Sequence, residues 1–209
     1  IDINGDFYSG GIVGSNDGTI ISSSVTGIVT GSNNVGGLAG SNAGFLNKSH
    51  TNASVTGGAQ VGGLVGANFD HAVYKSYAMG PVDGSSRVGG LVGSNYRTVT
   101  SSYATGPVTG DSKIGGLVGY NENDGDKTII TTSYATGTVR GTNAVGGLVG
   151  DNNASVSDSY WDTEATGQST SAGSAVGLTT AEMTGTTAQD RMSALDFEAT
   201  WDVVTSPDD

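Results

Sequence analysis

Oxygen-bearing side chains gather in the segment 121–126, which reads NENDGD. Within it, Asn121, Asn123, Asp124 and Asp126 supply amide and carboxylate oxygens around a glycine, and Ca²⁺ prefers such ligands in protein loops. The segment lacks the bidentate glutamate that closes a calcium loop at the expected spacing. We interpret these four residues as a candidate calcium site, and calcium is the single cofactor that the sequence suggests.

Tyrosine recurs at one position of a repeated segment. Tyr77, Tyr103 and Tyr134 each stand between a serine and an alanine. A surface column of aromatic rings can bind sugar rings, so these three residues form a candidate ligand-binding face. Stacked tyrosines also stabilise neighbouring strands, by about 0.5–1.5 kcal/mol per pair. Because the column is part of the repeat itself, the sequence favours the structural role over the ligand-binding one.

No set of residues with catalytic spacing accompanies these groups. The chain has no cysteine and two histidines, of which His50 occupies the tyrosine position in its own copy of the repeat. Neither HExxH nor GxSxG occurs. The doubled glycines resemble a phosphate-binding loop, but they recur six times without the lysine of a P-loop. We therefore predict that the chain is not an enzyme.

Charge argues against two classes of partner. The chain has 8 Lys and Arg against 20 Asp and Glu, a net charge of -12. Nucleic acids and anionic membranes are bound through clustered basic residues, so we expect no nucleic-acid partner. No apolar stretch reaches the length of a membrane-spanning segment, so we also expect no membrane insertion. Without cysteine, neither disulfides nor a thiolate metal site can form.

A repeat of about 26 residues carries these candidate groups. Its anchor is a doubled glycine in the text GGLVGSN and close variants, and the steps between anchors, by subtraction of residue numbers, are 26, 26, 27, 26 and 31 residues. The longest step contains an insertion at about Glu122 to Lys127, which we interpret as a loop that bulges from one coil. The anchors are Gly10-Gly11, Gly36-Gly37, Gly62-Gly63, Gly89-Gly90, Gly115-Gly116 and Gly146-Gly147.

The second half of each repeat alternates like a strand. In SYAMGPVD, which begins at Ser76, the small or apolar residues Ser76, Ala78 and Val82 alternate with residues that vary between copies. This period of two predicts a strand whose constant face points inward. Two further short apolar segments occur in each repeat, and glycine or asparagine separates them. We therefore expect a coil with about three sides.

Stacked coils would place equal positions of the repeat one above another, about 4.8 Å apart. An asparagine follows each anchor, and stacked amides can hydrogen-bond along the rod. We expect a structural Asn ladder, and we expect the glycines to supply tight corners with positive φ. The six asparagines are Asn16, Asn42, Asn68, Asn95, Asn121 and Asn152.

The sequence pattern of the chain changes after Gly167. Helical periodicity is absent before this residue, whereas Thr179 or Thr180 followed by Glu182 has the pattern of a capping box. Residues 187–195 (TAQDRMSAL) are the best candidate for a short helix. A terminal cap would cover strand edges that a solenoid otherwise exposes.

The anchor GG[IL][VA]GxN followed by SYATGxVxG resembles the GLUG-motif repeat of bacterial and archaeal surface proteins. The match runs from Gly10 to about Gly150, and SYWDTEATGQS with GLTTAEM is similar to the usual end of such arrays. The resemblance implies a β-solenoid in large secreted or surface-anchored proteins, including adhesin-like proteins and the non-catalytic part of some IgA-cleaving metallopeptidases. It implies no catalytic residues. Because the chain opens at Ile1 inside a repeat, we expect a mature or excised fragment.

These observations combine into one prediction. The fold is all-β, a parallel β-solenoid (β-helix) of about six coils over residues 1–167, with a small capping segment at 168–209 that contains a short helix. The function is that of a non-enzymatic structural or adhesive module at the cell surface or outside the cell. Its partner would be a glycan or protein on a host or neighbouring cell, or a second copy bound through the solenoid ends. The alternatives are a carbohydrate-binding or carbohydrate-active β-helix domain and a self-assembling filament subunit.

Overall fold

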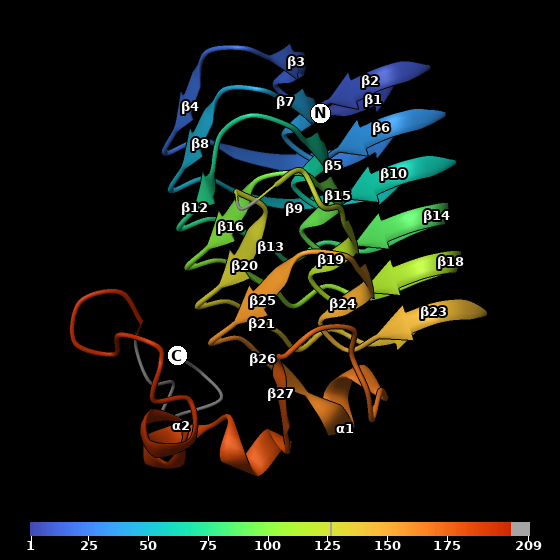
Figure 1. Ribbon diagram of the computed structural model, residues 1–209. Helices are drawn as coiled ribbons and strands as arrows, with labels where there is room; N and C mark the ends of the chain where they lie inside the picture. The colour runs from blue at the N-terminus through green and yellow to red at the C-terminus, as the bar shows by residue number, and fades with distance from the viewer. Residues whose placement is uncertain (126, 202–209) are drawn as a thin grey trace.

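The computed structural model describes residues 1–125 and 127–201, and most of these residues wind into a β-solenoid of about six coils (Figure 1). Neighbouring coils pair in parallel and in register, so that Asn42 is the partner of both Asn16 and Asn68. The predicted fold class is confirmed. The described part of the insertion after Asn121 lies outside the strands, and the pattern then resumes, because Ile129 pairs with Thr98 in the coil before and Ser155 in the coil after.

Three sheets form the sides of the solenoid, as the three apolar segments of the repeat predict. The sheet after the anchors contains β3 (Val13–Asn16), β7 (Ala39–Asn42), β11 (Val65–Asn68), β15 (Val92–Asn95), β19 (Val118–Asn121) and β24 (Val149–Asn152). The next sheet contains β4 (Thr19–Ile21), β8 (Phe45–Asn47), β12 (Val73–Tyr74), β16 (Thr98–Thr100), β20 (Ile129–Thr131) and β25 (Ser155–Ser157).

The third sheet is the largest and contains two segments of each coil, one with the tyrosine column and one that leads into the anchor. Its first eight strands are β1 (Asp2–Asn4), β2 (Phe7–Gly10), β5 (Ser24–Thr30), β6 (Asn33–Gly36), β9 (His50–Thr56), β10 (Ala59–Gly62), β13 (Tyr77–Ala78) and β14 (Val82–Gly89). The others are β17 (Tyr103–Ala104), β18 (Val108–Gly115), β21 (Tyr134–Ala135), β22 (Val139–Arg140), β23 (Asn143–Gly146), β26 (Tyr160–Asp162) and β27 (Val176–Leu178).

Few apolar groups per coil suffice for a core because each coil covers its neighbour. Leu38, Leu64, Leu91 and Leu117 follow the anchors of successive coils, and all four are fully buried. The alternation in the second half of the repeat is also correct, since Ala78 and Val82 are buried whereas Met79 is exposed. The constant face of the strand therefore points inward, as predicted.

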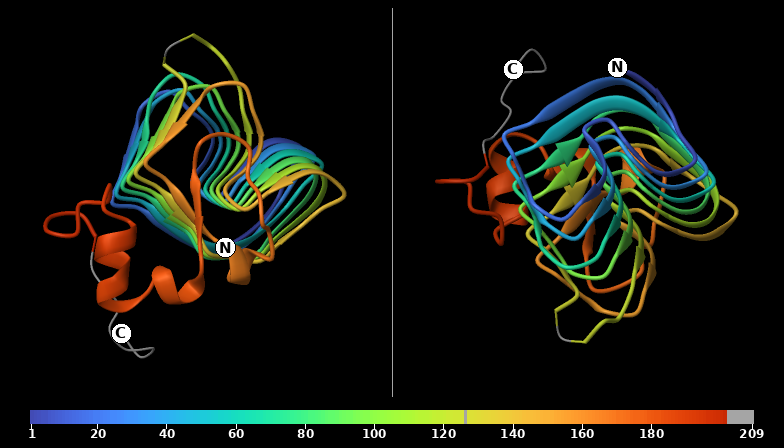
Figure 2. Two further views of the ribbon diagram at one scale, coloured as in Figure 1. Left: turned by 60° about the horizontal axis from the view of Figure 1, so that its bottom comes forward. Right: turned by 90° about the horizontal axis from the view of Figure 1, so that it is seen from above.

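The anchor glycines do not have the positive φ that we expected from the sequence. None of the doubled glycines lies in the left-handed region; they occupy a corner where strands approach closely. The left view of Figure 2 shows a coil with two lobes that meet at a re-entrant corner. A Cβ on Gly40 would lie 2.5 Å from the carbonyl oxygen of Asn34 across this corner, and one on Gly90 would overlap the carbonyl oxygen of Gly116. Backbone contact, rather than backbone conformation, requires these glycines.

Non-glycine residues supply the left-handed corners instead. Twelve of them have φ between +46° and +59°. This conformation costs an L-residue about 1 kcal/mol or more, so the contacts between coils must offset the strain. The corners form one column before the anchors (Tyr8, Asn34, Gln60, Arg87, Lys113 and Ala144) and one before the tyrosine column (Ser22, Lys48, Lys75, Ser101, Thr132 and Asp158).

The asparagine ladder is present as predicted. Each side-chain amide donates to the amide oxygen of the next coil at 2.7–3.0 Å, from Asn16 through to Asn152. Serine forms a second ladder. The sequence predicted that these serines face inward, and the structure adds their hydrogen bonds. The hydroxyl of Ser76 accepts from the Ser49 backbone N–H at 3.1 Å and donates to the Tyr74 carbonyl at 2.8 Å. The buried asparagine and serine side chains of these two ladders are thus hydrogen-bonded along the rod.

A C-terminal cap covers the last coil. It contains α1 (Thr163–Thr166), the 3₁₀ turn η1 (Thr180–Glu182) and α2 (Gly185–Arg191). The capping box is confirmed at Thr179, whose hydroxyl accepts from the Glu182 backbone N–H. The short helix α2 begins two residues before the predicted span and ends four residues before its end.

Helix α1 lies before Gly167, in the part of the chain whose sequence shows no helical periodicity. Asp162 caps this helix, because its carboxylate accepts from the backbone N–H groups of Glu164 and Ala165 at 2.9 Å. Gly167 ends it at φ 70°. One helical turn is too short to display periodicity in the sequence; only its caps identify it.

Candidate functional site

The aromatic column lies on the outer face of the largest sheet. Each ring stacks face to face on the ring of the next coil, with centroids 4.7–5.0 Å apart and ring planes within 8°. His50 heads the stack, as its place in the repeat predicts, and Tyr77, Tyr103 and Tyr134 follow. The column is therefore a continuous stack whose inner rings present their edges outward, because a neighbour covers both ring faces.

The cap covers the C-terminal part of this column, at Tyr103 and Tyr134. The ring of Trp201 is tilted against Tyr103 and Tyr134, with centroids 5.8 and 5.2 Å away. Burial, with the nearby Tyr77 as a smaller cause, raises the pKa of Tyr103 to about 12. Burial likewise raises the pKa of Tyr134 well above its ordinary value. Tyr160 continues the register but is buried among cap residues.

This geometry bears on the ligand-binding prediction for Tyr77, Tyr103 and Tyr134. A sugar that stacks on a ring needs a free ring face, and the inner rings of the column have none. Tyr77 and Tyr103 do line a groove of about 380 Å³ together with Lys75 and Trp201. The column can therefore offer hydroxyl groups and ring edges to a ligand, but no stacking platform.

The candidate calcium residues are divided between two environments. Asn121 is fully buried, and its amide oxygen accepts from Asn95 within the ladder at 2.9 Å. Asn123 and Asp124 are exposed in the loop outside the coil. Asp126 lies outside the described residues. The structure therefore does not bring Asn121 together with the loop side chains.

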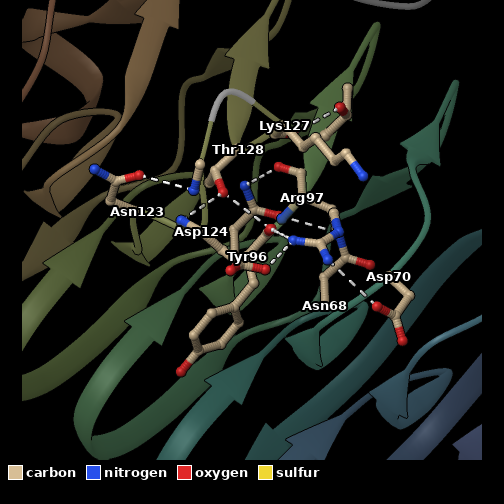
Figure 3. A network of polar contacts seen from close by, with 11 residues as sticks. Asn68, Asp70, Tyr96, Arg97, Asn123, Asp124, Lys127 and Thr128 are labelled. Carbon is tan, nitrogen blue, oxygen red and sulfur yellow. Dashed lines mark hydrogen bonds and ion pairs between the residues drawn. The ribbon is translucent and has the colours of Figure 1, made fainter.

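An arginine engages the loop carboxylate. Arg97 forms ion pairs with Asp124 of the next coil and Asp70 of the previous one, the latter at 3.4 Å (Figure 3). The Asn123 amide oxygen accepts from the Gly125 backbone N–H at 3.0 Å. These contacts hold the described part of the loop against the neighbouring coils. Among residues 1–125 and 127–201, no three His, Asp or Glu side chains gather into a potential metal site.

A second polar cluster, which sequence reasoning missed, lies at the re-entrant corner. Lys113 pairs with Asp151 at 2.7 Å, and its ammonium lies 3.8 Å from the ring centroid of Tyr120. The Tyr120 hydroxyl donates to Glu122 at 2.8 Å and accepts from the Asn153 amide at 2.8 Å. Burial, followed by the bond to Glu122, raises the pKa of Tyr120. Lys113, Tyr120 and Glu122 of one coil thus contact Asp151 and Asn153 of the next, so the cluster fastens two neighbouring coils together.

Two lysines also escaped the sequence analysis. Lys48 and Lys75 occupy left-handed corners of neighbouring coils, two residues before His50 and Tyr77. We call Lys48, Lys75, His50, Tyr77 and Tyr103 the lysine–tyrosine strip. The signal that marks both lysines is their common position in the repeat, two residues before the aromatic column.

The remaining histidine offers no catalytic arrangement. His71 is exposed, and its Nδ1 lies 3.0 Å from the Ala43 carbonyl oxygen. His50 is committed to the aromatic stack. None of the described helices is long and apolar enough to cross a membrane.

Comparison with known proteins gives one family match. The family described as "Glug: The GLUG motif" matches residues 84–109 and 110–140. Each matched segment spans the length of one coil, from the outer corner after one tyrosine strand to the next. No curated protein and no solved structure matches the chain significantly.

Proposed function

We propose that this solenoid, which carries the GLUG motif, is a non-enzymatic structural and adhesive module of a protein at the cell surface or outside the cell. One observation carries the proposal: the recurring side chains of the repeat serve contacts between coils. The asparagines bond to one another, the tyrosines stack and the glycines admit neighbouring backbones. What remains for function is the variable outer surface of a rod.

Self-association is a second candidate, and it concerns the first coil. We call the face of this coil formed by β2, β3 and β4 the open end. Ile12 is 47% exposed there, whereas its counterparts Leu38 and Leu148 are fully buried. Exposed apolar groups beside unpaired strand edges favour association. The exposed apolar residues of the first coil are Ile1, Phe7, Tyr8, Ile12, Ile21 and Ile28.

The cap argues against a filament built head to tail. Backbone groups of the last coil are already paired, since Gly147 N–H donates to the Thr170 carbonyl and Ala172 N–H to the Val149 carbonyl, both at 3.0 Å. A second copy would therefore meet the cap rather than a strand edge. An assembly of this chain through the open end would therefore join two copies, each with its cap on the far side.

The adhesive function is testable with the protein alone. Purified protein on beads should be retained by a glycan array or by a surface coated with cell-envelope material, and no substrate should be consumed. Reducing-sugar and peptide-cleavage assays on the same ligands provide the control. Stoichiometric hydrolysis of a glycan or peptide would contradict a non-enzymatic role, and sedimentation would reveal dimers through the open end.

A further inference from the structure

We propose that the lysine–tyrosine strip binds the carboxylate groups of an acidic glycan that lies along the rod axis. The inference rests on the proposed adhesive function and names the class of its partner. Lys75, Tyr77 and Tyr103 line one groove, and Trp201 bounds this groove on the side of the cap. Lys48 continues the strip away from the cap, because it occupies the same corner in the preceding coil.

Charge singles out this strip in an otherwise acidic chain. Among the described residues, the ion pairs engage Arg97, Lys113 and Arg191 but neither Lys48 nor Lys75. No carboxylate occurs at the corner position or at the flanking outward positions in the first four coils. Those positions are Ile21, Ser22, Ser24, Asn47, Lys48, His50, Tyr74, Lys75, Tyr77, Thr100, Ser101 and Tyr103.

This arrangement matters because the chain carries 20 carboxylates against 8 basic groups. Two ammonium groups on adjacent coils, without a local carboxylate, form a focused positive site. Lys75 also lies 5.3 Å from the Tyr74 ring centroid, a contact that favours one position for its ammonium group. The strip can therefore attract an anion although the chain as a whole repels one.

The aromatic stack indicates what kind of anion fits. Its inner ring faces are covered, so a base of single-stranded nucleic acid could not stack there. The net charge of -12 also opposes a dense phosphate backbone. Phenol hydroxyls donate and accept, and an ammonium group has three donors. A ligand that alternates hydroxyl groups with carboxylates, repeated along the 4.7 Å spacing of the coils, uses both.

A linear oligogalacturonate is a suitable probe, because it carries one carboxylate and free hydroxyls on every sugar. Calorimetric titration at low ionic strength should give a Kd on the order of 0.1 mM. The double variant K48Q/K75Q should weaken binding by about tenfold, the loss expected when a charged hydrogen-bond partner is removed. Y77F, which retains the stack and loses one hydroxyl, should weaken it by about threefold.

The matched control is K127Q/R140Q, which removes two charges from exposed positions outside the strip. It should change the Kd by less than about twofold. Equal losses in both double variants would overturn the proposal, since binding would then depend on net charge alone. So would tighter binding of single-stranded RNA, or of the methyl-esterified oligomer, than of the acid form. Adhesion through neutral sugars alone would refute the strip but leave the adhesive function standing, whereas absence of all adhesion would refute the function.

Discussion

The two ends of the rod are built from the same repeat but meet their surroundings differently. At the covered end, Leu148 is fully buried; at the open end, its counterpart Ile12 is half exposed. The difference lies in the last coil. Trp161 occupies the repeat position that is alanine in the preceding coil, and it pairs with that alanine, Ala135. Trp161 packs on Gly147, and its indole N–H donates to the Gln168 carbonyl at 2.9 Å. One bulky residue and a strap of chain thus replace a whole coil.

The open end is only partly covered by the first strand. β1 pairs with β5, and the Ile1 amino group donates to the Thr26 carbonyl at 2.9 Å. β2, β3 and β4 have a partner on one side only in the described structure. The same position of the repeat therefore contributes differently to stability at the two ends, according to the coil that lies against it.

Removing the Trp161 side chain, which covers the last coil, should have the largest effect on stability. Trp161→Ala should lower the free energy of unfolding by about 4 kcal/mol, because a buried aromatic ring is lost and a cavity opens over Gly147. Denaturant unfolding measures this loss. Hydrogen exchange should quicken first in β24 and β26; uniform exchange along the rod would contradict the assigned cover.

Leu91 and Ile12, which occupy the same position of the repeat, compare the interior with the open end directly. Leu91→Ala should lower the free energy of unfolding by about 3 kcal/mol, since this side chain is fully buried. Ile12→Ala should cost less than about 1 kcal/mol, because half of its surface is already exposed. Equal costs in chemical denaturation would show that Ile12 is covered in solution, as in a dimer through the open end.

A glycine pair sharpens the same contrast. A Cβ on Gly44 would overlap the backbone of Gly18 in the preceding coil, whereas a Cβ on Gly18 meets nothing closer than an Asn16 side-chain atom at 3.9 Å. Gly44→Ala should therefore destabilise by about 2 kcal/mol. Gly18→Ala should be neutral or stabilise by up to about 1 kcal/mol through the unfolded chain. Thermal unfolding of both variants decides the matter, and a large loss at Gly18 would contradict an uncovered first coil.

The stability of the protein at alkaline pH should depend on Tyr103, which the cap partly covers. The pKa of Tyr103 is raised to about 12, so the folded state keeps a proton that the unfolded state loses at an ordinary tyrosine pKa near 10. The stability that Tyr103 contributes is complete below about pH 10 and declines as the pH rises through about 12. Tyr103→Phe should remove this part of the decline, as tyrosinate absorbance and circular dichroism would show. An unchanged alkaline profile would contradict burial of the ring by the cap.

Periodicity made the solenoid predictable. Glycine spacing, the inward Ala78 and Val82 and the asparagine ladder follow from one rule, that equal positions stack. The repeat did not reveal why the anchor positions require glycine, because close backbone contact and a positive φ both favour this residue. The left-handed corners were hidden for the opposite reason: residues as different as Ala144 and Lys113 occupy them.

The candidate sites were less predictable, since they depend on side chains that do not repeat. NENDGD has the composition of a calcium loop, but the ladder takes up Asn121, and Arg97 from another coil pairs with Asp124. The tyrosine column was foreseen as a stack, whereas its cover by Trp201 depends on a tail with no counterpart in the repeat. Contacts between side chains that do not recur in the repeat leave no signal in the sequence.

The register of the coils also determines how the rod would respond to tension. Hydrogen bonds between coils run along the rod axis, and Ser24 and its partner His50 are separated by 26 residues of chain. A load along the axis would therefore pull directly on these bonds and open them one coil at a time. Each opened coil would release about 90 Å of extended chain. Such a rod would lengthen in steps under load and limit the force that it transmits. Each released coil could then refold onto the coil that remains.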